Sequence, residues 1–114
     1  MSEEAWYAFD GGGTIGAAGS EDGVIMRDDE HANGARITLE RDSTIAPFAI
    51  TCGIYGAMVH TRWFSSEAQA QHDYDAMKQA LDAIIRGPLE NDQNFTAGTK
   101  TSSEAIEEFV ERFP

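Results

Sequence analysis

The period of the apolar residues changes once along this chain of 114 residues, and that change constrains the fold more than any other feature. Short apolar runs separated by glycine, asparagine and proline fill residues 5–64, a pattern typical of β-strands. From residue 67 onward the apolar residues recur at helical spacing. Strands followed by helices, rather than alternating with them, predict the α+β class with an antiparallel sheet.

The length of the chain suits one hydrophobic core, so we expect a single domain over residues 1–114. The expected sheet is a meander of three to four strands within residues 5–64. One long helix, at about 66–86, should cover a face of this sheet. A connector at 88–102 and a short helix at about 103–113 should complete the domain.

Two of the expected strands form a hairpin. The dipeptide Asn33-Gly34 accepts positive φ at low cost and predicts a turn between strands at Val24–Arg27 and Arg36–Arg41. In the second of these strands Ile37 and Leu39 alternate with polar residues, which predicts one buried and one wet face.

The segment Phe48–Phe64 carries apolar residues on both parities, which favours a long central strand that is buried on two sides. Because seventeen residues is long for a strand, we expect Gly53 or Gly56 to introduce a bulge or bend.

The long helix is the clearest amphipathic element. Ser65 or Ser66 can cap its start, and Gly87-Pro88 should stop it. One face gathers the apolar residues Ala70, Tyr74, Met77, Leu81, Ile84 and Ile85. In the short helix Ile106, Phe109, Val110 and Phe113 recur at helical spacing, and this helix must dock on its own domain or on a neighbour.

The segment from Phe9 to Gly16, Phe-Asp-Gly-Gly-Gly-Thr-Ile-Gly, is the most conspicuous motif. Its Asp-Gly-Gly-Gly-Thr part resembles the first phosphate loop of the sugar kinase and actin superfamily, and its Gly-Gly-Thr-Ile part is similar to the amino-terminal loop of bacterial asparaginases. These resemblances imply a loop that binds phosphate or an attacking threonine, respectively. Both families need chains several times longer, so a glycine-rich turn after the first strand is the structure we predict.

The net charge of −12 repels phosphate backbones, so we expect neither nucleic acid nor an anionic membrane surface as a partner. No uncharged stretch is suited to a membrane-spanning helix, since Pro47 and two glycines interrupt the longest one. The acidic start, Met1 to Glu4, lacks the features of a secretory signal and favours a cytoplasmic location. Cys52 is the only cysteine, in keeping with a reducing compartment, and we expect it to be a core thiol.

No cofactor and no metal site is predicted. The pairs Glu30-His31 and His72-Asp73 lack further ligands at metal-binding spacing, and the acidic run from Asp28 to Glu30 is interpreted as a solvated hairpin tip.

A candidate site can be drawn around His60. It shares a parity with Arg62, while Arg36 and Glu40 lie on the polar face of the preceding strand. Were these residues to converge with Tyr55, His60 could act as a general acid or base, as in a small hydrolase or isomerase, or bind a small anion. The alternative is a core histidine that is hydrogen-bonded to the backbone.

Three histidines, one cysteine and scattered carboxylates assemble no complete catalytic constellation. The sequence therefore favours a non-catalytic module that binds a protein or a small molecule, or that assembles with itself, over the hydrolase or isomerase. We expect a homodimer, formed by the uncovered face of the sheet or by the docking face of the last helix, because one helix covers only part of a sheet face.

Overall fold

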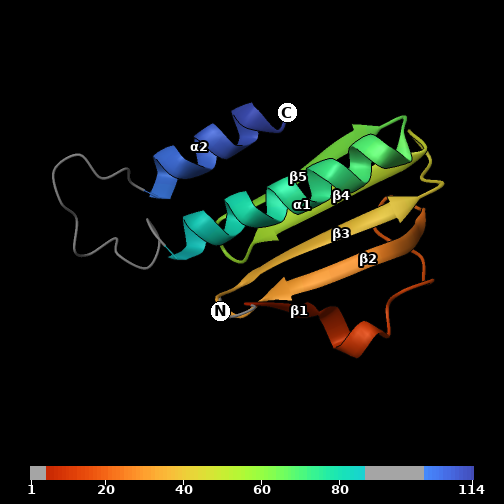
Figure 1. Ribbon diagram of the computed structural model, residues 1–114, viewed down its shortest axis with the longest axis horizontal. Helices are drawn as coiled ribbons and strands as arrows, with labels where there is room; N and C mark the ends of the chain where they lie inside the picture. Colours follow the sequence, from red (N-terminus) through yellow and green to blue (C-terminus); the bar gives the residue numbers. More distant parts are fainter. Residues whose placement is uncertain (1–4, 87–101) are drawn as a thin grey trace, which may run out of the picture.

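The computed structural model describes residues 5–86 and 102–114. Its elements follow the expected order, with the strands before both α-helices (Figure 1). The strands are β1 (Trp6–Ala8), β2 (Val24–His31), β3 (Ala35–Arg41), β4 (Phe48–Ile54) and β5 (Met58–Phe64). A 3₁₀ turn, η1 (Phe9–Gly12), follows β1, and the helices are α1 (Glu67–Ile84) and α2 (Ser102–Arg112).

All strands pair antiparallel in chain order, which confirms the α+β meander, but the sheet has five strands rather than three to four. The segment Phe48–Phe64 accounts for one of the additional strands, since it is a hairpin and not one long strand. Gly56, with φ of +79°, lies in the turn between β4 and β5. Gly53 introduces no bulge, because it pairs in register with Arg36 on one side and Val59 on the other.

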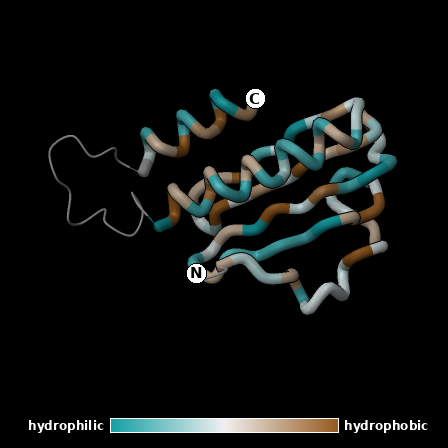
Figure 2. Tube along the Cα trace, viewed as in Figure 1, coloured by the Kyte–Doolittle hydropathy of each residue, from teal (hydrophilic) through white to brown (hydrophobic). Residues whose placement is uncertain are grey.

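The hairpin at Asn33-Gly34 is confirmed, but its first strand is longer than predicted. His31 pairs directly with Ala35, which leaves only residues 32–34 for the turn. The acidic run Asp28–Glu30 therefore lies within β2 and not at a solvated tip. Figure 2 shows this hydrophilic half of β2 beside the alternating pattern of β3. Pairing with β3 and β1 outweighs the low strand propensity of these residues.

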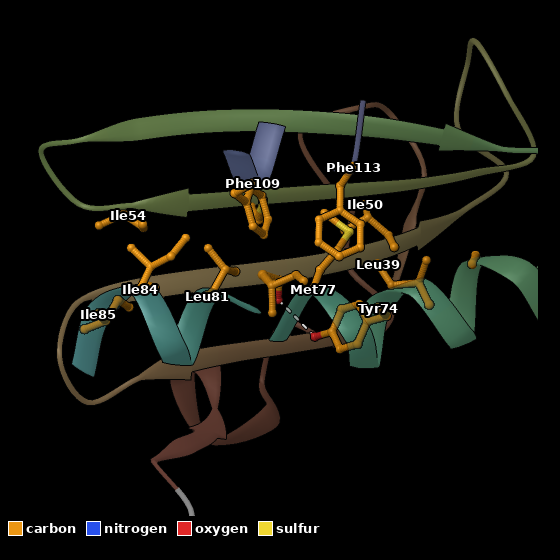
Figure 3. Packing of buried hydrophobic residues seen from close by; sticks show 14 of the residues in the cluster. Leu39, Ile50, Ile54, Tyr74, Met77, Leu81, Ile84, Ile85, Phe109 and Phe113 are labelled. Atoms are coloured by element: carbon orange, nitrogen blue, oxygen red, sulfur yellow. Dashed lines mark hydrogen bonds between the residues drawn. The ribbon is translucent and has the colours of Figure 1, made fainter. Parts of the chain in front are cut away.

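The two faces of the sheet have different coverings. Helix α1 packs on the face that carries Ile37 and Leu39 of β3 and Ile50 and Cys52 of β4 (Figure 3). The opposite face, called the open face below, is covered in part by the loop of residues 13–23 that precedes β2 and by Phe9 of η1, which lies over Arg36. The open face thus offers the space for a site.

Helix α1 begins as predicted, because the Ser66 hydroxyl accepts a hydrogen bond from the amide of Gln69 at 3.3 Å. The six apolar residues predicted for its inner face are all buried. Tyr74 also donates from its hydroxyl to the Ile37 carbonyl at 3.0 Å, which joins the helix to the middle strand. The predicted stop at Gly87-Pro88 and the connector at 88–101 lie outside the described residues.

The short carboxyl-terminal helix docks on its own domain. Helix α2 packs beside α1, and its Phe109 and Phe113 are 3% and 4% exposed in the common core (Figure 3). The apolar face of α2, which the sequence analysis considered as a dimer interface, is therefore buried against the core of its own chain.

Candidate functional site

The residues of the sequence-derived site lie on opposite faces of the sheet. His60 and Arg62 project toward the helices, where His60 Nε2 lies 2.5 Å from the Phe113 carbonyl oxygen. Arg62 donates to the Pro114 carbonyl at 3.2 Å and forms an ion pair with Asp73. These two side chains anchor the carboxyl terminus, and His60 has the backbone hydrogen bond expected of a structural histidine.

Arg36, Glu40 and Tyr55 belong to the other side. Arg36 and Glu40 project onto the open face, and Tyr55 lies in the turn that follows β4. The structure thus brings Arg36 and Tyr55 to one region and places His60 and Arg62 in another. The strand register causes this separation, because paired residues project to the same face of a sheet and successive residues to opposite faces. Arg36 pairs with Gly53 and therefore projects onto the open face, whereas His60 pairs with Cys52, which faces the helices.

A groove with a volume of about 690 Å³ lies on the open face. Its floor comes from the strands, and the loop of residues 13–23 forms one wall. Apolar groups dominate the lining, notably Ala17, Ala18, Ile25, Ala57 and Val59. Polar groups come from Thr14, Arg36, Thr38, Thr51 and Tyr55. The volume and the lining are those of a site for a small molecule.

Arg36 is the only charged residue among the described residues that line the groove. A carboxylate below the lining fixes its guanidinium: Nε donates to Asp28 Oδ1 at 2.9 Å and Nη2 donates to Asp28 Oδ2 at 2.7 Å. The ring of Phe9 lies 3.6 Å from the guanidinium carbon and stacks on it. Such a two-point pair with stacking sets the orientation of the arginine before any ligand arrives.

Asp28 is the centre of this cluster. Its side chain is fully buried, and its oxygens also accept hydrogen bonds from the hydroxyls of Thr14 at 2.8 Å and Thr38 at 3.1 Å. Burial by itself would raise the pKa of Asp28, but the hydrogen bonds from Arg36, Thr14 and Thr38 outweigh it and hold the pKa below its usual value. Asp28 is therefore ionised at neutral pH, and its role is structural.

A second buried carboxylate holds the wall of the groove. Glu40 is 0% exposed, and its Oε1 accepts hydrogen bonds from the amides of Glu21 at 3.2 Å and Gly23 at 3.0 Å. The loop approaches so closely that a Cβ on Gly19 would lie 2.2 Å from Glu40 Cδ. Glu40 thus acts on the groove through the loop and does not line it.

Glu30 lies beside the groove between two tyrosines. Its carboxylate oxygens accept hydrogen bonds from the Tyr7 hydroxyl at 3.1 Å and the Tyr55 hydroxyl at 2.8 Å. Desolvation and the hydrogen bond to Glu30 raise the pKa of Tyr55 to about 12. Tyr55 is consequently a neutral hydroxyl at physiological pH and has no acidity suited to proton transfer.

Outside the groove, His31 and Asp82 form a polar pair between β2 and α1. His31 is buried, and its Nδ1 accepts from the Asn33 amide at 3.0 Å. This hydrogen bond assigns the ring proton to Nε2, which donates to Asp82 Oδ1 at 2.6 Å. The pair ties β2 to α1, and no group that could act as a nucleophile contacts it among the described residues.

Cys52 is a core thiol, as expected. It is 2% exposed, and burial raises its pKa to about 12. The thiolate that a nucleophile or a metal ligand would need is therefore disfavoured. Within residues 5–86 and 102–114 no cluster of histidine, cysteine and carboxylate side chains could hold a metal ion.

The sequence analysis missed Asp28, Phe9 and Thr14, which build the groove's polar end. The signal for Asp28 was present, because a short turn at Asn33-Gly34 sets a register in which Asp28 faces Thr38. Phe9 and Thr14 belong to the conspicuous segment from Phe9 to Gly16, but an irregular loop brings them to the sheet, so no strand register could place them beside Asp28.

Comparisons of the chain with protein-family models, with curated proteins and with solved structures found no match in any of the three. No helix in the described part of the chain is both long enough and apolar enough to cross a bilayer.

Proposed function

We propose that this protein is a non-catalytic binding module whose groove on the open face takes a small molecule with an apolar body. The observation that carries the proposal is a groove of about 690 Å³ whose lining is mostly apolar. The one charged group among its described lining residues, Arg36, is held in place by Asp28. Sites for small molecules combine an apolar lining with a few fixed polar groups in this way.

The chemistry of the groove supports binding rather than catalysis. None of its described lining residues is a histidine, a lysine or a carboxylate, and its one cysteine has a raised pKa. The hydrolase or isomerase considered from the sequence needs His60, Arg62 and Tyr55 together, whereas His60 and Arg62 hold the carboxyl terminus on the other face. We also propose a cytoplasmic location, in keeping with a sole cysteine that is free and buried.

The test uses N-phenyl-1-naphthylamine, a neutral apolar dye that becomes fluorescent when it leaves water. We expect saturable enhancement with the folded protein. Substitution Ala18→Trp should abolish it because the indole would fill the groove, whereas Ala32→Trp, at an exposed alanine in the β2–β3 turn, should leave it unchanged. Equal enhancement by both variants, or none by the native protein, would contradict the proposal.

We further propose that the protein forms a homodimer through β5. This strand is an edge of the sheet, and its open-face residues Val59 and Trp63 are 80% and 38% exposed. Antiparallel pairing of two copies centred on Thr61 would align all seven residues of β5 and set each Val59 against Trp63 of the second copy. Pairing of edge strands satisfies backbone groups, and pairs of aromatic and β-branched residues favour it.

Sedimentation equilibrium tests the homodimer. The native protein should have twice the monomer mass of 12.4 kDa at micromolar concentration. Substitution Val59→Lys should yield monomers, because charge blocks edge pairing, whereas Ile45→Lys, at a residue 73% exposed outside the strands, should not. A native protein that sediments only as a monomer would rule this interface out.

A further inference from the structure

The charge distribution around Arg36 indicates which class of ligand the groove accepts, an inference that rests on the proposed function. A lone arginine in an apolar groove suggests at first a carboxylate ligand. The neighbours of Arg36 indicate a different class of ligand, because two of its donor nitrogens already donate to the Asp28 carboxylate.

Two acidic residues flank Arg36 in the strand register. Glu30 is its direct cross-strand partner on β2, and Asp28, two residues earlier on the same strand, makes the two-point ion pair. Both carboxylates act on Arg36 electrostatically. One positive and two negative charges leave a net charge of −1 at this end of the groove, so a second carboxylate from a ligand would meet repulsion.

The hydrogen-bond inventory of the same region indicates what the ligand must supply. Thr14 and Thr38 donate to Asp28, and Tyr55 donates to Glu30, so these hydroxyl protons are already used. Arg36 donates through Nε and Nη2, which leaves Nη1 without an acceptor among the described residues. Because a desolvated N–H needs an acceptor, a ligand that covers Arg36 must bring an oxygen.

We propose that the groove selects uncharged amphiphiles, in which a carbonyl or hydroxyl oxygen accepts from Arg36 Nη1 and an aliphatic or aromatic body lies against Ala18, Ile25 and Val59. Amides, esters and alcohols belong to this class. Carboxylates and phosphates of the same length are rejected by Asp28 and Glu30. The net charge of −12 acts in the same direction, since it lowers the local concentration of anions.

The experiment compares octanamide with octanoate, which have the same chain length and differ in charge. Titration of each into the ¹⁵N-labelled full-length protein at pH 7 is followed by chemical shifts. We expect octanamide to shift the amides of Thr14 and Val59 and to bind at least about tenfold more tightly than octanoate.

Two variants separate the role of charge from that of folding. Glu30→Gln removes one repelling carboxylate at a partly exposed position, and it should raise the octanoate affinity severalfold relative to the octanamide affinity. Arg36→Lys keeps a cation beside Asp28 but lacks the Nη1 donor, so it should weaken octanamide binding.

The outcomes distinguish this inference from the proposed function. Octanoate that binds as tightly as octanamide, or a Glu30→Gln variant with unchanged octanoate affinity, would overturn the selection of uncharged ligands and leave a binding groove in place. Failure of the dye and of both amphiphiles to reach the groove would overturn the proposed function itself.

Discussion

Replacement of Asp28 by asparagine should be among the most damaging isosteric substitutions in this protein. The native carboxylate is fully buried and accepts four hydrogen bonds, two of them from Arg36. The asparagine side chain has one acceptor oxygen, and its amide group would face two of the four donors. The Thr14 hydroxyl can rotate to accept from that amide, but the Arg36 guanidinium has no acceptor to offer.

The magnitude follows from these contacts. Losing one hydrogen bond between charged groups costs about 1.5–3 kcal/mol, and the second hydrogen bond to Arg36 weakens because its acceptor is no longer ionised. Breaking one partner of a buried ion pair costs about 3–5 kcal/mol, but the Arg36 side chain is 35% exposed, so water recovers part of the loss. We therefore expect the free energy of unfolding to fall by about 3 kcal/mol, equivalent to a decrease in Tm of about 10 °C or more.

Urea denaturation at pH 7, followed by circular dichroism, measures this change. The matched control is Glu30→Gln on the same strand, whose tyrosine partners Tyr7 and Tyr55 are 50% and 55% exposed, and it should cost less than about 1 kcal/mol. An Asp28→Asn variant no less stable than Glu30→Gln would refute the view that a buried, fully paired carboxylate organises the groove.

Three further predictions follow from buried groups. The pKa of Asp28 in the folded protein lies below its ordinary value of 3.8. The ionised carboxylate therefore contributes fully to the free energy of unfolding above that pH, and this contribution is lost as the pH falls. Lowering the pH from about 5 to 2 should consequently reduce the stability of the native protein more than it reduces the stability of the Asp28→Asn variant. Gly19→Ala should lower the free energy of unfolding by about 1–3 kcal/mol, because its Cβ would meet Glu40 at 2.2 Å, whereas Ser20→Ala should change it by less than about 0.5 kcal/mol in the same denaturation assay. Cys52, with a pKa raised to about 12 and an exposure of 2%, should react with a thiol reagent at about pH 8 far more slowly in the native than in the denatured protein. Equal rates would contradict its burial.

The sequence predicted the elements whose packing follows from local periodicity. The inner face of α1 was readable because each of its apolar residues lies three or four positions from the next, and the cap at Ser66 was readable from the residue type. The hairpin at Asn33-Gly34 was also predictable from residue type, since few dipeptides accept positive φ so easily.

The strand count failed where local patterns were ambiguous. Apolar residues at both odd and even positions of Phe48–Phe64 suggested a strand buried on two sides. Tyr55 instead belongs to a turn, and Val59 is 80% exposed. Side-chain hydrophobicity alone does not distinguish a buried face from an exposed edge.

The candidate site depended on information that no segment carries by itself. Residue types identified Arg36 and Tyr55 as chemically interesting, but the register of four strand pairs placed them on the open face and placed His60 and Arg62 on the other. Asp28 acquired its role because the tertiary structure buried it among four donor groups of three residues. Sequence by itself determined the class of fold, the long helix and the acidic surface, since these follow from composition and short-range period. Only the tertiary structure decided where the groove lies and which charge it presents, because burial and pairing arise from contacts between residues distant in the chain.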